Sequence, residues 1–189
     1  MESWADVTHL RLLVPPVPQM RPDEPCLEAF QRELDYIHRT LRRLGTSASE
    51  VEDLAQDVFL ALRRAWPQYD VTRPLRPYLF GIAFRIASAH HRKNRREVPF
   101  GIVDVDHGGP GPDDMLQSRQ ARALVLAALE RIPLPRRAVL VMRDLDDVPI
   151  HDVASVLEIP LFTAYSRLRK ARRELETAIR RILRKAQFP

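Results

Sequence analysis

The 189-residue sequence has little of what disulfide-rich, zinc-binding or membrane-spanning proteins need. Cys26 is its single cysteine, which excludes an internal disulfide framework and a zinc site built from several cysteines. No uninterrupted apolar run approaches the roughly 18–20 residues that span a bilayer. Met1–Val14 lacks the basic start and long apolar stretch of a signal peptide. We therefore expect a soluble, cytoplasmic protein without membrane insertion.

Patterns of catalytic sites are also missing. The histidines show no metal-ligand spacing with Cys26 or with carboxylates. The glycines of residues 108–111 follow no predicted strand, so they do not form a phosphate-binding loop. The adjacent carboxylates Asp146 and Asp147 lie where a turn would expose them. We expect no catalytic residue, no metal, no cofactor and no enzymatic activity.

Charge is present but sorted along the chain. The net charge is only +5, yet Arg85–Arg96 and Tyr165–Arg173 are basic and hold no acid. Acidic residues gather in Glu50–Asp57 and again in Asp104–Asp114. Basic blocks favour a polyanion as partner, and acidic blocks favour a basic protein surface. Solvated helix faces are the alternative, which explains each block singly better than all four.

Proline and apolar spacing divide the chain. Prolines forbid a continuous helix in residues 1–25. Residues 26–97 carry three apolar stripes at helical spacing, whereas 98–117 is rich in Pro, Gly and Asp and predicts a linker. Helical spacing returns over 118–189. The fold class we expect is all-α, with two small helical domains joined by a flexible acidic linker.

Local signals place some of the helix ends. A single stripe from Leu27 to Leu44 predicts one helix that Gly45 terminates. A capping box of Ser49 and Glu52 predicts the start of the next helix, and Trp66-Pro67 its end. The apolar run Ala138–Met142 fits a strand or a helix, and periodicity leaves the choice open.

The strongest local pattern lies at residues 149–173. A short helix, a turn of about four residues and a second helix with a basic outer face predict a helix-turn-helix. The second helix of such a motif enters the major groove of DNA, where Arg prefers guanine edges. An ordinary helical hairpin with a charged face is the alternative.

Two stretches resemble a known family. Glu52–Leu60, Trp66, Tyr69-Asp70 and Tyr78–Ala83 are similar to region 2 of the extracytoplasmic-function (ECF) sigma factors of bacterial RNA polymerase. Residues 129–172 are similar to their region 4. The resemblance implies a transcription initiation factor that binds core polymerase through the β′ clamp helices and the β flap. It also implies promoter DNA and an anti-sigma factor as partners.

The resemblance assigns roles to individual residues. An acidic helix would dock on the polymerase clamp with Glu52, Asp53, Gln56 and Asp57. The −10 promoter element would be captured, melted and held by Asp70, Arg73, Leu75, Tyr78, Arg85, Arg92, Lys93, Arg95 and Arg96. The −35 element would be read by Pro160, Thr163, Tyr165, Ser166, Arg167, Arg169 and Lys170.

Several residues depart from the family pattern. Arg85 stands where the family commonly has Asn, Leu75 where it has an aromatic residue, and Tyr78 where it has Trp. In the turn of region 4, Glu158 and Phe162 replace glycines. Other residues fit such a turn when φ stays negative, so we expect the turn to survive with altered geometry.

Two other classes of function remain open at this point. One is a stand-alone helix-turn-helix regulator with an N-terminal sensing or dimerisation domain. The acidic block Glu50–Asp57 would have no task in such a regulator. The other class is a helical adaptor that makes no DNA contact.

Overall fold

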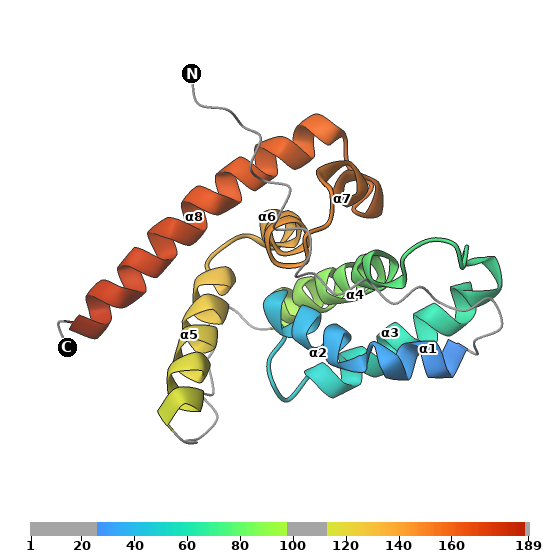
Figure 1. Ribbon diagram of the computed structural model, residues 1–189, viewed down its shortest axis with the longest axis horizontal. Coiled ribbons are helices and arrows are strands. Elements are labelled where there is room, and N and C mark those ends of the chain that lie inside the picture. The colour runs from blue at the N-terminus through green and yellow to red at the C-terminus, as the bar shows by residue number, and fades with distance from the viewer. Residues whose placement is uncertain (1–25, 98–112, 188–189) are drawn as a thin grey trace.

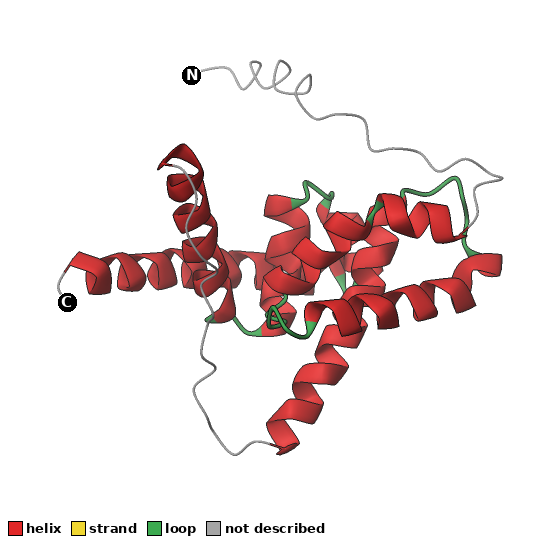
Figure 2. Cartoon of the chain, turned by 90° about the horizontal axis from the view of Figure 1, so that it is seen from below, coloured by secondary structure: helices red, strands yellow, loops and turns green. Residues whose placement is uncertain are grey.

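The structure is a computed structural model that describes residues 26–97 and 113–187. These residues form eight α-helices and no strand (Figure 1), which confirms the all-α prediction. The helices are α1 (Cys26–Arg32), α2 (Leu34–Arg43), α3 (Val51–Ala65), α4 (Leu75–Glu97), α5 (Asp113–Glu130), α6 (Leu134–Leu140), α7 (Ile150–Val156) and α8 (Leu161–Gln187). Both views show α8 extending beyond the other helices (Figures 1 and 2). None of the helices in this part of the chain is long and apolar enough to cross a membrane.

The first stripe forms two helices rather than one. The chain breaks at Glu33, between α1 and α2, although the apolar spacing runs through without interruption. The Glu33 side chain is only 2% exposed and accepts a hydrogen bond from Arg76 Nε at 2.8 Å. The prediction of a single helix was therefore wrong. A buried carboxylate held by a residue of α4 accompanies the break, and periodicity does not report on such a contact.

The second helix ends as predicted, at a glycine. Gly45 has φ +94°, a conformation that other L-residues rarely adopt. Its amide donates to Arg42 O at 3.0 Å, and the Thr46 amide donates to Leu41 O at 3.1 Å. These are the two bonds of a Schellman motif, which satisfies carbonyls that the helix end would otherwise leave unpaired.

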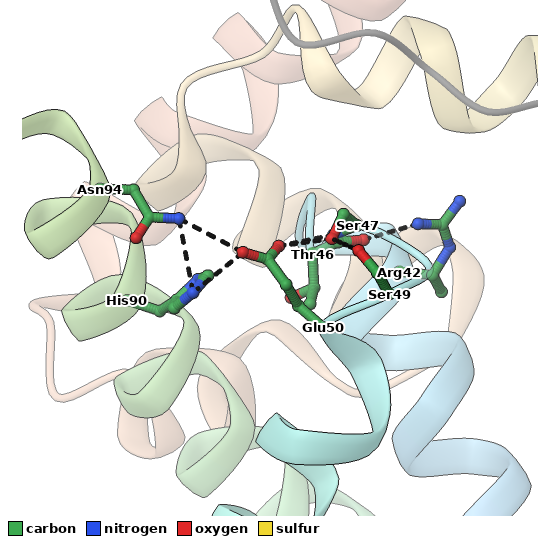
Figure 3. A network of polar contacts seen from close by, with 7 residues as sticks. All are labelled: Arg42, Thr46, Ser47, Ser49, Glu50, His90 and Asn94. Atoms are coloured by element: carbon green, nitrogen blue, oxygen red, sulfur yellow. Dashed lines mark hydrogen bonds and ion pairs between the residues drawn. The ribbon is translucent and has the colours of Figure 1, made fainter. Parts of the chain in front are cut away.

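A polar network fixes the start of α3, but with other residues than the predicted capping box. Glu50, not Glu52, accepts hydrogen bonds from the amide and hydroxyl of Ser47 (Figure 3). Its second oxygen lies 3.2 Å from His90 Nε2 and 3.4 Å from Asn94 Nδ2, both on α4. The Ser47 hydroxyl is the main cause that lowers the pKa of Glu50. The network ties the N-terminus of α3 to the C-terminal half of α4.

The C-terminal helices pack around α8. Helix α5 starts at Asp113, inside the range predicted as linker. The run Ala138–Met142 is helical, because α6 continues into a π-helical turn at Val141–Leu145. Arg136 binds Glu174 through two hydrogen bonds, of 2.9 and 2.7 Å, and Arg172 binds Asp144 in the same way, at 2.8 and 2.7 Å. These pairs fix α8 against α6 and the π-helical turn.

The two halves of the chain pack against each other. Helix α4 contacts α7, and α2 contacts α5. One apolar cluster contains Leu41 and Phe80 from the first half and Ile132 and Val153 from the second. At the junction, His91 of α4 lies with Nε2 3.2 Å from the carbonyl oxygen of Leu44. The same carbonyl accepts a hydrogen bond from Arg137 of α6 at 2.7 Å.

The environment of His91 predicts a loss of stability in mild acid. Burial is the main cause that lowers the pKa of His91; the charges of Arg137 and His90 act in the same direction, whereas Leu44 O and Glu50 oppose them. Because the folded pKa is lowered, the unfolded chain takes up the proton first as the pH falls through about 6.5. We expect the urea midpoint of unfolding to fall below that pH, and to fall less in His91→Gln. Equal pH profiles for the two proteins would contradict this.

Candidate nucleic-acid interface

The loop before α4 is shaped by its own side chains. Asp70 Oδ1 accepts hydrogen bonds from the Thr72 amide at 3.0 Å and the Thr72 hydroxyl at 2.6 Å. These bonds are the main cause that lowers the pKa of Asp70. The Tyr69 hydroxyl donates to the carbonyl of Arg73 at 2.6 Å, which closes the loop from the other side. Asp70 thus has a structural task in the turn, while the side chain of Arg73 is exposed.

Aromatic rings support this loop. The ring centroids of Trp66 and Tyr69 lie 5.7 Å apart in a stacked arrangement, and those of Tyr69 and Tyr78 lie 4.8 Å apart. Leu75, at the first position of α4, is 2% exposed and belongs to the core. Its side chain offers no surface to a nucleic acid, so the predicted −10 contact by Leu75 is a correction. An apolar residue at this place packs inward because it begins a helix that covers the bundle.

The basic residues of α4 spread along one side of the helix. Arg85 and Arg92 are seven positions apart, so they lie on nearly the same face and about 10 Å from each other along the axis. Arg92 and Lys93 are exposed. Arg95 and Arg96 belong to the last turns of α4, and their side chains lie outside the described residues. The Arg85 guanidinium is also exposed, but it lies 3.2 Å from Glu158 of the other half of the chain.

The predicted helix-turn-helix is present as α7, a turn and α8. The Glu158 amide donates to Ser155 O at 3.2 Å, and the Ile159 amide donates to Ala154 O at 3.0 Å. This is a second Schellman motif, with Glu158 in the position that glycine usually takes. Glu158 has φ +53°, so the expectation of a negative φ and altered geometry was wrong. The turn keeps its glycine-like conformation, and Phe162 lies inside α8.

The conformation of Glu158 predicts a difference between two substitutions. Glu158→Gly removes both the Arg85 pair and the strain of the left-handed conformation, whereas Glu158→Ala removes only the pair. A non-glycine residue in this region costs about 1–2 kcal/mol relative to glycine. We expect the Gly variant to be more stable than the Ala variant by about 1 kcal/mol in urea unfolding. Equal stabilities would show that residue 158 does not hold a positive φ in solution.

One side of α8 faces solvent and the other faces α6 and α7. Ala164, Leu168 and Ala171 are buried at helical spacing. The predicted −35 residues lie on or beside the opposite face. Pro160, Tyr165, Arg169 and Lys170 are exposed, and Thr163, Ser166 and Arg167 are half-buried. The exposed set combines cations with hydroxyl and aromatic groups, which bind phosphates and base edges.

Sequence reasoning missed two features of this helix. Phe162 is 82% exposed, at the end of α8 that carries the predicted reading residues, although it was treated only as a missing glycine. Arg172 belongs to the basic block but is bound by Asp144, whose hydrogen bond is the main cause that raises the pKa of Arg172. Its guanidinium therefore anchors α8 rather than a nucleic acid. The spacing of charges alone does not distinguish an anchoring arginine from a free one.

The acidic residues of α3 form a separate face. Glu52, Asp53, Gln56 and Asp57 are exposed, whereas Leu54, Ala55 and Val58 between them are buried. Spacing of four residues places Glu52 above Gln56 and Asp53 above Asp57 on the helix. A groove of about 500 Å³ runs beside this face between α3 and α4, lined by Leu60 and Ile86 among others.

Two protein-family models match the chain in order. Sigma-70 region 2 matches residues 29–97, and sigma-70 region 4 matches residues 122–175. Together the matches cover most of the described residues. The chain belongs to the ECF sigma factors. The region 2 match ends with α4, and the region 4 match begins within α5 and ends within α8, so both regions of the sigma factor include a basic helix.

Curated relatives agree with this assignment of the sigma factor. The RNA polymerase sigma factor NccH of Alcaligenes xylosoxydans xylosoxydans is 25% identical over 154 residues, which cover 78% of this chain and 83% of the relative. The ECF RNA polymerase sigma-E factor of Escherichia coli strain K12 is 23% identical over 149 residues, covering 73% of this chain and 78% of the relative.

Solved structures share the fold of the sigma factor. The sigma factor RpoE of Bartonella quintana, crystallised with the anti-sigma factor NepR, matches with a TM-score of 0.59 and 21% identity. That match covers 81% of this chain and 98% of RpoE. CnrH, in complex with the cytosolic domain of CnrY, matches with the same TM-score and identity and covers 80% of this chain and 85% of CnrH.

Proposed function

We propose that this ECF sigma factor binds core RNA polymerase through the acidic face of α3, in the cytoplasm and without chemistry of its own. The support is the exposure of Glu52, Asp53, Gln56 and Asp57 on one side of a helix whose other side is buried. Carboxylates arranged in this way complement a basic protein surface, speed association and fix orientation. The groove beside them adds apolar area from Leu60 and Ile86.

The same proposal assigns the −10 element to α4 and the loop before it. Arg73, Arg92 and Lys93 are exposed and present positive charge for promoter phosphates. Tyr69 and Tyr78 form an aromatic surface next to the loop, on which an unstacked base of the melted strand can rest. Asp70 contributes indirectly, by holding the turn that positions Arg73.

The −35 element is assigned to the exposed face of α8. Tyr165, Arg169 and Lys170 reach outward from its first three turns, and Phe162 adds an apolar group suited to a thymine methyl. A single reading helix offers few base contacts, so we expect weak DNA binding by the free chain. Polymerase tethers both regions and raises the effective concentration of each at its element.

An anti-sigma factor is the proposed regulator. RpoE of Bartonella quintana was crystallised with the anti-sigma factor NepR, and CnrH was solved with the cytosolic domain of CnrY. The fold shared with these two proteins supports the same type of control for this chain.

Transcription in vitro tests the proposal. The purified chain is mixed with core bacterial RNA polymerase and fragmented genomic DNA, and the 5′ ends of the transcripts are mapped. Sharply positioned new starts that share two upstream elements are expected. Core polymerase without the chain is the control. Failure to bind core polymerase, combined with tight specific binding of a duplex by the free chain, would instead support a stand-alone regulator.

A further inference from the structure

The two surfaces assigned to promoter DNA touch each other in this structure. Arg85 Nη1 of α4 lies 3.2 Å from Glu158 Oε1, in the turn that leads into α8. Next to this pair, a Cβ atom at Gly81 would lie 3.1 Å from Val156 Cγ1 of α7. The helix-turn-helix therefore covers part of the face of α4 that carries Arg85.

A buried arginine joins the halves beneath this contact. Arg137 of α6 is 6% exposed and donates to the carbonyl oxygens of Ile132, Glu130 and Leu44. The first two belong to its own half, whereas Leu44 caps α2. Burial lowers the pKa of Arg137 to about 10, so its guanidinium still carries its charge at neutral pH. Its bond to Leu44 O, of 2.7 Å, is thus a charge-assisted contact between the halves.

A third contact is an ion pair with a tyrosine. Asp146, which follows the π-helical turn, accepts a hydrogen bond from Tyr36 Oη at 2.9 Å and from Arg43 Nη1 at 2.8 Å, both on α2. The side chain of Asp146 is only 9% exposed. We call the three contacts Arg85–Glu158, Arg137–Leu44 and Asp146–Tyr36/Arg43 the latch.

The latched arrangement does not span a promoter. Elements centred near −10 and −35 are separated by about 25 base pairs, which is roughly 85 Å of B-form duplex. In the latched chain, the turn before α8 is in direct contact with α4. The 15 residues 98–112 between α4 and α5 permit, by chain length alone, a separation of up to about 50 Å between their ends.

We propose that the latch keeps the free sigma factor closed, and that the two regions must separate before both promoter elements can be bound. This inference rests on the proposed function, because it concerns the step that precedes promoter recognition. Closure covers the Arg85 face of α4, while the acidic face of α3 stays exposed. Core polymerase can therefore bind the closed chain first and open it afterwards.

The interface has the character of a contact that can be released. A cavity of about 800 Å³ lies between α4 and the α5–α6 connection, lined by Phe84, Arg92, Arg131 and Leu134 among others. An interface with a void of this size lacks the dense packing of a permanent core. Burying the charges of Arg137 and Asp146 also costs desolvation energy, which offsets much of their attraction to their partners.

A disulfide across the interface tests the proposal. Gly81→Cys and Val156→Cys place two sulfur atoms where the Cβ of residue 81 and the side chain of residue 156 already meet. Cys26→Ser removes the remaining thiol. The isolated chain is oxidised, the oxidant is removed, and core RNA polymerase and fragmented genomic DNA are then added, with and without a reductant. Gly81→Cys alone, in the Cys26→Ser background, is the control.

We expect the oxidised chain to bind core polymerase but to give at least tenfold fewer mapped transcript starts than the same protein after reduction. Equal numbers of starts before and after reduction would overturn the latch and leave the sigma function intact. Absence of starts from the reduced chain and the control as well would contradict the proposed function itself.

A charge reversal gives an independent reading of closure. Arg43→Glu places a second carboxylate next to Asp146 and is expected to open the free chain, which small-angle scattering detects as a larger radius of gyration. Adding Asp146→Arg restores opposite charges and is expected to restore the compact value. An unchanged radius in a folded Arg43→Glu chain would contradict a latch at this place.

Discussion

Replacing Asp53 and Asp57 by lysine is expected to weaken binding to core polymerase by about 100-fold or more, which corresponds to roughly 2.7 kcal/mol. The two carboxylates lie four residues apart on the exposed face of α3. Placing like charges against a basic partner costs several kcal/mol, so reversal does more than removal. The fold should tolerate the change, since both side chains are exposed; Asp53 in the first turn contributes no more than about 1 kcal/mol through the helix dipole. Titration of labelled sigma factor with core polymerase measures the loss.

A matched variant controls for net charge. Glu28→Lys combined with Asp35→Lys changes the charge equally, at exposed positions of α1 and α2. This control is expected to keep core affinity within about threefold. The loss in the α3 variant should shrink at high salt, because ions screen exposed charges. Similar losses in both variants would mean that α3 is not the docking face.

The helices and the helix-turn-helix could be predicted from the sequence because they depend on local spacing. Leu54, Ala55 and Val58 are buried where the apolar stripe of α3 places them, and Gly45 ends α2 in the conformation that glycine allows. The family resemblance added the order of the two regions. It also pointed to the exposed acids of α3, whose role in docking stays a prediction.

What could not be predicted depends on partners far along the chain. Glu33 breaks the first helix with its carboxylate held by Arg76, 43 positions later. Arg172 leaves the basic face because Asp144 binds it, 28 positions earlier. Glu158 keeps a left-handed conformation in which local propensity favours glycine. Spacing within one helix carries no information about such contacts, so charge blocks overstate how many cations are free.

Arg137→Met is expected to lower the free energy of unfolding by about 3–5 kcal/mol, a loss typical for breaking a buried charged network. Methionine has similar volume but no donor, and it would leave the carbonyls of Ile132, Glu130 and Leu44 without the bonds that Arg137 now provides. A loss of this size corresponds to a melting temperature lower by roughly 10 °C in a chain of this length. Arg131→Met, at an exposed neighbouring position, is the matched control and is expected to stay within about 0.5 kcal/mol.

Gly45 provides a double-mutant test of the same site. A Cβ at residue 45 would collide with the Arg137 guanidinium, and φ +94° adds backbone strain, so Gly45→Ala is destabilising for two reasons. In the Arg137→Met background the collision with the guanidinium is absent and only the strain remains. We therefore expect Gly45→Ala to cost at least about 1 kcal/mol less in that background. Additive losses in urea unfolding would show that Arg137 does not lie against Gly45, and the bond from Arg137 to Leu44 O would then be excluded as a contact between the two halves.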